Sequence, residues 1–138
     1  MSLYNIFGIA GSALSASSVM LNTTASNMAN AQSVSSSSGE TYRAKHPVFQ
    51  TLYQSNRQSQ MQSPGVQVVD IVESNAEPLR KHAPDHPMAD KDGYIYTSNV
   101  NSIEEMANMI SASRAYQTNL TVADTAKKLL QRTLTLGQ

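Results

Sequence analysis

The side chains most capable of chemistry lie in one short stretch, residues 82–93 (HAPDHPMADKDG), which holds two histidines and three aspartates. Imidazole and carboxylate groups can ligate metal ions. For zinc, His82 and His86 would share one face only in a helix, and the prolines of this stretch disfavour a helix. A calcium loop fails as well, because its first ligand position would be Met88 and no glutamate follows at its twelfth. We therefore interpret the stretch as a surface loop made rigid by proline.

Other catalytic patterns are missing from the sequence. There is no cysteine, which excludes a thiol nucleophile and a thiolate metal site. The serines do not form a Gly-x-Ser-x-Gly elbow, and neither a Walker A nor a dinucleotide-binding pattern occurs. We expect no enzymatic activity, no cofactor, and no catalytic, cofactor-binding or metal-binding residues. The remaining enzymatic alternative is a metal-dependent hydrolase that would use His82 and His86.

Charge is scarce and unevenly distributed. Charged residues make up 14% of the 138 residues, against about 25% in a typical globular domain, and none of the 20 charges lies in residues 1–39. The net charge of zero, without a basic cluster, argues against binding nucleic acid or an anionic membrane surface. No basic residue precedes Arg43, so the basic part of a secretory signal is missing. We also expect no membrane insertion, since no apolar run approaches about 18 residues.

The elements at the two ends of the chain are predicted to be long helices. Residues 2–31 have a heptad spacing of large apolar side chains, and Ser2 can cap the start. The other faces carry Ala, Ser, Thr and Asn, which suit close packing against other helices better than contact with water. The residues of the heptad series are Phe7, Leu14, Leu21 and Met28.

The second helix is predicted over residues 102–136. Ser102 and Glu105 have the spacing of a capping box, and Gly137 ends the helix. Apolar residues recur along it at steps of three and four. This stripe comprises Ile103, Met106, Met109, Ile110, Tyr116, Leu120, Ala123, Ala126, Leu130 and Leu134.

The middle of the chain changes character. Residues 32–41 are rich in serine and are predicted to form a flexible loop. Three strands are expected, over Tyr42–Gln54, Gly65–Glu73 and Gly93–Thr97, separated by Pro and Gly.

These elements predict a mainly α fold with a small, irregular β module and two terminal helices that pair antiparallel like a coiled coil. The expected domains are the N-terminal axial helix (1–31), the loop (32–41), the β module (42–98) and the C-terminal axial helix (99–138).

Two motifs near the ends of the chain carry a family resemblance. The first runs from Leu14 to Ala31 and contains Asn27-Met-Ala-Asn30; the second begins with Asn99-Val-Asn101. It continues with Glu105-Met106 and Ser113-Arg-Ala-Tyr116-Gln-x-Asn119. Both resemble signatures of the bacterial flagellar rod, hook and hook-associated axial proteins. Three further stretches extend the resemblance over essentially the whole chain and point to the proximal rod: Tyr42–Gln50, Asp90–Tyr94 and Leu134–Gly137.

The resemblance implies a structural, self-assembling subunit of the proximal rod in the flagellar basal body, which transmits motor torque and encloses the export channel. It implies export through the flagellar type III apparatus without a cleaved signal, and a location in the rod that crosses the periplasm. The implied partners are further copies of the chain, the other proximal and distal rod subunits, and the adaptor that links the rod to the MS ring and export gate. We expect the assembly interface to comprise Phe7, Leu14, Leu21, Asn27, Met28, Asn30, Asn99, Val100, Asn101, Glu105, Met106, Arg114, Tyr116, Asn119 and Leu120.

One non-enzymatic alternative stays open beside the rod subunit. The two long helices would also suit a soluble binding module or export chaperone, in which they form a closed two-helix clamp. Such a clamp would be a discrete small oligomer, whereas a rod subunit would be monomeric when dilute and would polymerise when concentrated.

Overall fold

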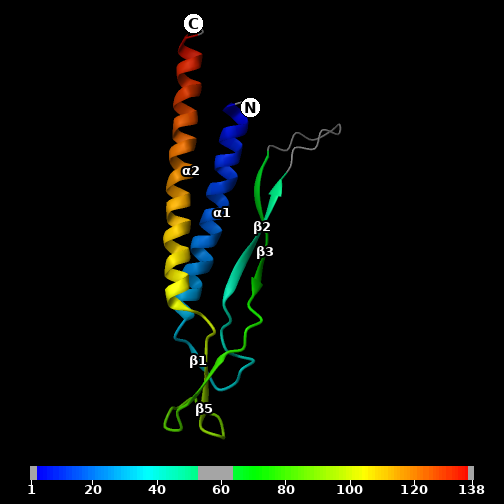
Figure 1. Ribbon diagram of the computed structural model, residues 1–138, viewed down its shortest axis with the longest axis vertical. Coiled ribbons are helices and arrows are strands. Elements are labelled where there is room, and N and C mark those ends of the chain that lie inside the picture. The colour runs from blue at the N-terminus through cyan, green and yellow to red at the C-terminus, as the bar shows by residue number, and fades with distance from the viewer. Residues whose placement is uncertain (1–2, 53–63, 137–138) are drawn as a thin grey trace. The chain divides into compact units, whose positions relative to one another are not determined.

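The computed structural model describes residues 3–52 and 64–136 and confirms the mainly α fold with a small β insertion (Figure 1). Helix α1 (Leu3–Asn30) and helix α2 (Ser102–Leu136) enclose the strands in sequence. Both helices agree with the predicted ranges to within a residue. Ser2 and Gly137, predicted to start α1 and to end α2, lie outside the described residues.

The described residues between the helices contain five strands, where three were expected. The expected strands correspond to β2, β3 and β5, while β1 and β4 were not predicted. Strand β2 begins at Lys45, three residues after the predicted start, and the last two residues of that prediction, 53 and 54, lie outside the described residues. The bounds are β1 (Val34–Ser35), β2 (Lys45–Leu52), β3 (Gly65–Glu73), β4 (Leu79–His82) and β5 (Tyr94–Thr97).

The strands form two small sheets. One has three strands in the order β1-β5-β4, and both of its pairs are antiparallel. The other consists of β2 and β3. Strand β1 lies inside the serine-rich stretch that was predicted to be a loop, and its register pairs Val34 with Thr97. Two residues carry no alternating pattern, so this strand depends on pairing with a distant part of the chain.

The chain divides into two compact units, each of which combines distant segments. Unit 1 comprises residues 1–21, 47–70 and 111–138, and unit 2 comprises residues 22–46 and 71–110. The division cuts across both helices and therefore follows contacts rather than sequence order. The expected four-part division of the chain stays a prediction.

Unit 1 is built around alanine. Within it the two helices run in opposite directions (Figure 1). Its buried apolar side chains are Ala10 and Ala16 on α1 and Ala112 and Ala126 on α2. Such short side chains allow helix backbones to approach closely but remove little apolar area from water. The unit therefore has close packing with a small hydrophobic core.

Unit 2 has a mainly polar interior. Only Ala44 and Ile95 are buried apolar residues there among the described ones. Buried polar groups need hydrogen-bond partners, and no buried side-chain nitrogen or oxygen of the described residues is left without one. The buried polar residues are Thr23, Thr24, Asn27, Ser35, Thr41, Ser98 and Glu105.

One described helical segment, Asn5–Asn30, is long and apolar enough to cross a membrane by length and composition. The expectation that no stretch approaches this limit was therefore wrong. The physical reason is that α1 contains no charged residue, so its many Ala, Ile, Leu, Met and Val side chains outweigh its Ser, Thr and Asn. Core helices and N-terminal signal sequences pass the same test, so the finding by itself is weak evidence for a membrane span.

Candidate assembly surface

Large apolar side chains on α1 remain accessible although its alanines are buried. Phe7 is 48% exposed, and Leu14, Leu21 and Met28 are each partly exposed. Leu14, Leu21 and Met28 are therefore partly covered within the chain, while Phe7 keeps the most surface that a neighbouring protein could cover.

Helix α2 also buries alanines and leaves large apolar side chains exposed, and the difference in exposure is greater than on α1. Ile103 is 75% exposed and Leu120 is 51% exposed, while Ala112 and Ala126 are each at most 3% exposed. Exposed apolar side chains on this scale mark interaction surfaces, since a stable monomer covers most of them. The other exposed large apolar residues of α2 are Met106, Ile110, Tyr116, Val122, Leu129 and Leu134.

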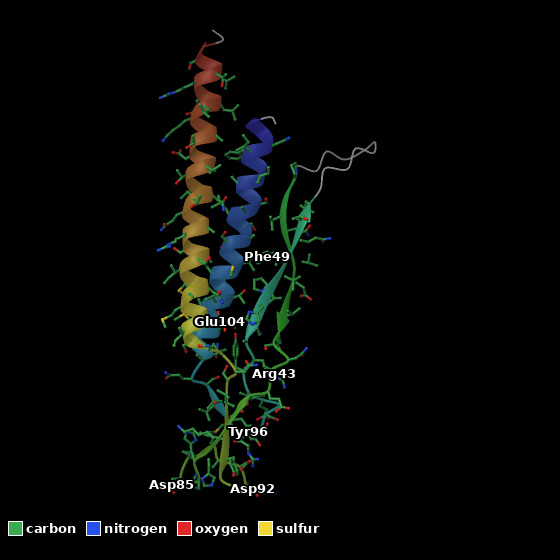
Figure 2. All side chains as sticks on the ribbon, viewed as in Figure 1. Arg43, Phe49, Asp85, Asp92, Tyr96 and Glu104 are labelled. Atoms are coloured by element: carbon green, nitrogen blue, oxygen red, sulfur yellow. The ribbon has the colours of Figure 1, made fainter. Side chains whose placement is uncertain are left out.

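Open apolar hollows lie along the helices among the described residues of unit 1. One of about 230 Å³ has a floor of alanine and serine from both helices and is bordered by Phe49 of β2, which Figure 2 labels. A second, of about 220 Å³, lies between Ile6 of α1 and the Thr121–Leu129 segment of α2. The third, of about 280 Å³, is bordered by Phe7 and Leu134. Alanine and serine form most of the first hollow, whereas larger side chains border the third, and each hollow is large enough to accept a side chain.

Asn27, from the first signature, is turned into its own chain. It is 1% exposed, and its Nδ2 donates to the carbonyl oxygen of Lys45 at 2.8 Å. Its Oδ1 accepts from the backbone nitrogen of Lys45 and from the hydroxyl of Tyr42, both at 2.9 Å. With every polar atom of its side chain engaged, Asn27 has no surface for a neighbour, and its role in the described chain is to fasten the segment before β2 to α1.

Two asparagines of the second signature also make intrachain bonds. Asn99 Oδ1 accepts from the backbone nitrogen of Ala44 at 2.8 Å, and its Nδ2 donates to the carbonyl oxygen of Ala76 at 2.9 Å. Asn101 Oδ1 accepts from the backbone nitrogen of Ile103 at 3.1 Å. These side chains connect three segments of unit 2 at the entrance to α2.

The N-cap of α2 is therefore Asn101, one residue before the predicted Ser102. The amide of Glu105, which Ser102 was expected to bond, donates instead to the carbonyl oxygen of Asn101 at 3.0 Å. Ser102 is already helical. The sequence pattern misled because Asn and Ser are about equally good caps and stand next to each other.

The remaining residues of the expected interface fall into two groups. Asn30 and Asn119 each donate from Nδ2 to the carbonyl oxygen four residues earlier, at 2.8 Å and 2.9 Å, and both remain partly exposed. Glu105 is only 4% exposed and contributes little surface. Those that do offer surface, besides the apolar residues already described, are Asn30, Val100, Arg114 and Asn119.

Residues 83–93 form a loop between β4 and β5, as predicted, whereas His82 is the last residue of β4 and pairs with Tyr94. The His82 ring packs edge-on against Tyr94 with centroids 4.9 Å apart, and His86 Nδ1 accepts from the backbone nitrogen of Met88 at 3.1 Å. Across the part of the chain that the structure describes, no group of three or more His, Asp and Glu is placed to hold a metal ion.

Some structural contacts had escaped the sequence interpretation. Ser12 Oγ on α1 accepts from the backbone nitrogen of Val66 at 3.2 Å, next to Gly65. Two arginines, Arg43 and Arg80, border one cleft in unit 2. Only Gly65, at the start of a predicted strand, carried a signal, because glycine in a strand often marks a close backbone approach.

Comparison with known proteins supports the interpretation of the ends of the chain. Residues 91–136 match the family described as the C-terminal region of the flagellar basal body rod FlgEFG proteins. This match covers β5, all of α2 and the second signature. The C-terminal third of the chain is therefore similar to structural proteins of the bacterial flagellar rod.

Full-length relatives define the family more narrowly. The chain is 50% identical to the flagellar basal-body rod protein FlgC of Yersinia enterocolitica, 48% to that of Escherichia coli O157:H7 and 46% to that of Salmonella typhimurium strain LT2. Each match extends over 138 residues and covers 100% of both chains. The chain belongs to the family of the flagellar basal-body rod protein FlgC. It is a structural subunit of the rod in the flagellar basal body, and thus part of the apparatus of motility.

Proposed function

We propose that this chain is a subunit of the proximal rod that polymerises through its terminal helices. The rod would act as the drive shaft that transmits motor torque and would enclose the export channel. The observation that carries the proposal is that α1 and α2 bury alanines and expose large apolar residues, Ile103 at 75% and Leu120 at 51%. Those surfaces gain stability only when other subunits cover them.

The absence of charge from α1 supports assembly on several sides of that helix. A charge buried in a helix interface is expensive unless a partner is assured, at several kcal/mol for each ion. Neutral Ser, Thr and Asn satisfy hydrogen bonds in either environment. Contacts in such a polymer are heterologous, which means that each subunit presents one surface to a different surface of its neighbour.

The proposed partners are further copies of the chain, the other proximal rod subunits, the distal rod and the adaptor between the rod and the MS ring and export gate. We infer export through the flagellar type III apparatus without a cleaved signal, into a rod that crosses the periplasm. Protein rather than lipid is the proposed environment of α1, since Asn27 and Thr24 are buried in its own chain. We propose no nucleic-acid binding and no catalytic role.

The accessible members of the expected interface form the proposed assembly surface. The signature residues that make hydrogen bonds within the chain, such as Asn27 and Asn99, would hold the elements that carry this surface in place. The assembly surface proper consists of Phe7, Leu14, Leu21, Met28, Asn30, Val100, Met106, Arg114, Tyr116, Asn119 and Leu120.

A charge placed on this surface tests the proposal. Leu120→Lys, introduced into the chromosomal gene, should abolish rods and swimming, because the lysine would be buried in the polymer. The isolated variant should keep its circular dichroism spectrum, since Leu120 is 51% exposed in the single chain. The matched control is Asn75→Lys, which adds the same charge at an exposed position after β3.

Normal rods and swimming in the Leu120→Lys strain would contradict the proposal. Sedimentation velocity distinguishes a rod subunit from a closed helical clamp. A rod subunit should grow in average mass as its concentration rises, whereas a clamp should hold one small, fixed oligomeric state.

A further inference from the structure

A polar cleft in unit 2 has the composition of a site for carboxylates. It encloses about 310 Å³ between the turn before β2, the segment before β4, and β5. Arg80 of β4 and Tyr96 of β5 are direct cross-strand partners, so both side chains stand on the same face of the sheet. The lining residues are Ser38, Arg43, Glu77, Pro78, Arg80 and Tyr96.

The two arginines differ in how they are held. The Arg80 guanidinium lies 3.6 Å from the centroid of the Tyr94 ring, a cation–π contact that fixes its position and leaves its N–H groups available. Arg43 is partly buried, and among the described residues it has no ion pair. Glu77 borders the same cleft without an ion pair to either arginine. The cleft therefore carries one net positive charge and guanidinium groups that match a carboxylate in shape.

The loop between β4 and β5 presents two free carboxylates. Asp85 and Asp92 are exposed, lie at the two turns at the end of the sheet (Figure 2) and have no ion pair within the described chain. Asp90 holds the loop, since its Oδ1 accepts from the backbone nitrogens of Asp92 at 2.9 Å and Tyr94 at 2.8 Å. Gly93 has φ of +78°, and a Cβ there would stand 3.1 Å from Pro84.

This loop is consequently a projection with its backbone held in one shape, and it carries the exposed side chains of Asp85, Lys91 and Asp92. Bonds from the Ala83 nitrogen to the Gly93 oxygen at 2.9 Å, and from the Asp90 nitrogen to the Tyr94 oxygen at 2.8 Å, continue the hairpin beyond the strands. A rigid projection loses little conformational entropy when it binds.

We propose that the Asp85–Asp92 loop of one subunit inserts into the Arg43–Arg80 cleft of a second copy of the chain. Two free carboxylates meet two arginines, and the projection and the cleft are different surfaces of one unit. The contact is thus heterologous and can repeat from subunit to subunit. The inference rests on the proposed function, because it adds a contact between β modules to the assembly through the terminal helices.

Directed disulfide formation tests this contact, and the absence of native cysteine leaves only the introduced thiols to react. Full-length Ser38→Cys, with a cysteine in the cleft, is mixed with a size-tagged Lys91→Cys chain, which keeps both aspartates of the loop. Under mild oxidation the mixed dimer should form at least about tenfold faster than in a control mixture in which Asn75→Cys replaces Lys91→Cys. An equal rate in the two mixtures would overturn the proposal.

Charge reversal provides the second measurement. Arg43→Glu in the Ser38→Cys chain should slow cross-linking by at least about tenfold, because the glutamate would place a negative charge against the carboxylates of the loop. Asp85→Arg together with Asp92→Arg in the Lys91→Cys chain should restore the rate. Cross-linking that ignores the Arg43 charge would contradict the contact, since the loop would then not lie in the cleft.

Sedimentation velocity of the unmodified chain, run at the same concentration, distinguishes the two proposals. Concentration-dependent growth together with control-level cross-linking overturns the loop-and-cleft contact alone. Neither growth nor cross-linking overturns both proposals.

Discussion

The side-chain amide of Asn27 bonds both backbone groups of Lys45, at 2.8 Å and 2.9 Å, and thereby acts as a neighbouring strand would. Lys45 is the first residue of β2, so this contact fixes where the strand leaves helix α1. The Tyr42 hydroxyl completes the site by donating to the same Oδ1 at 2.9 Å. A residue of the family signature thus organises the subunit that the assembly uses.

Replacing Asn27 by aspartate should destabilise the isolated chain. The carboxylate keeps its two acceptor contacts but no longer donates to the Lys45 carbonyl, and it places a charge at a position that is 1% exposed. An unsatisfied buried partner costs about 1–3 kcal/mol, and a buried charge adds to that. Urea unfolding followed by circular dichroism measures the loss.

Asn22→Asp is the matched control for this change. Asn22 is exposed on the same helix, so the same substitution there should alter the free energy of unfolding by at most about 0.5 kcal/mol. Equal effects at both positions would contradict the role assigned to Asn27.

Gly65 and Ser12 form a second close contact, in unit 1. A Cβ at Gly65 would lie 2.6 Å from Ser12 Oγ, the atom that accepts from the Val66 nitrogen. Gly65→Ala should therefore destabilise the chain by about 1–3 kcal/mol through overpacking. The penalty should be smaller in a Ser12→Ala background, because the clashing oxygen is then gone.

A double-mutant cycle on urea unfolding measures that coupling. Additive effects of the two substitutions would show that β3 does not approach α1 at this point. Glycine is required here because a side chain would collide with Ser12, and not because the backbone has a positive φ.

The N-cap of α2 offers a direct comparison of adjacent residues. Asn101→Ala should lower stability by about 1 kcal/mol, because the Ile103 amide loses its acceptor. Ser102→Ala should be neutral or slightly stabilising, since Ser102 is helical and alanine is the better helix former. Thermal unfolding followed by circular dichroism compares the two, and a larger loss for Ser102→Ala would restore the capping box that the sequence indicated.

Much of the fold follows from local patterns in the sequence. The heptad series of residues 2–31 and the apolar stripe of residues 102–136 predict the bounds of both helices to within a residue, because each pattern repeats several times along its helix. Strand β3 was predicted over Gly65–Glu73, as observed. Strand β1 was missed because two residues hold no period, and β4 because Leu-Arg-Lys-His lacks the aromatic and β-branched residues that marked β5. Both pair with β5.

The candidate interface was only partly readable for a related reason. Exposed apolar residues such as Ile110 and Leu120 belong to a stripe that any helix surface could bury, in the chain or in a polymer. A neutral amide such as that of Asn27 or Asn99 satisfies an intrachain bond as well as an interchain one. Composition therefore indicates that these helices pack against protein, but it does not distinguish packing within the chain from packing against another subunit. Only the hydrogen-bond distances show that Asn27 and Asn99 make contacts within the chain.

The alanines between the helices of unit 1 provide the last prediction. Ala112 is 2% exposed and also lines the hollow beside Phe49, so leucine there must either push α1 and α2 apart or force its side chain into that hollow, at about 1–3 kcal/mol. Ala115→Leu, one turn further along the same helix at an exposed position, should change stability by at most about 0.5 kcal/mol. Urea unfolding compares the pair, with identical chemistry at each site.

The same two substitutions should affect polymerisation differently from stability. Ala115 borders the hollow beside Phe49, so leucine there would fill space that we assign to a neighbouring side chain. Ala115→Leu should consequently weaken polymerisation while leaving the single chain stable, and Ala112→Leu should impair both. If Ala115→Leu chains polymerise as readily as the unmodified chain, that hollow is not part of the assembly surface, and the contact must lie further along the exposed stripe of α2.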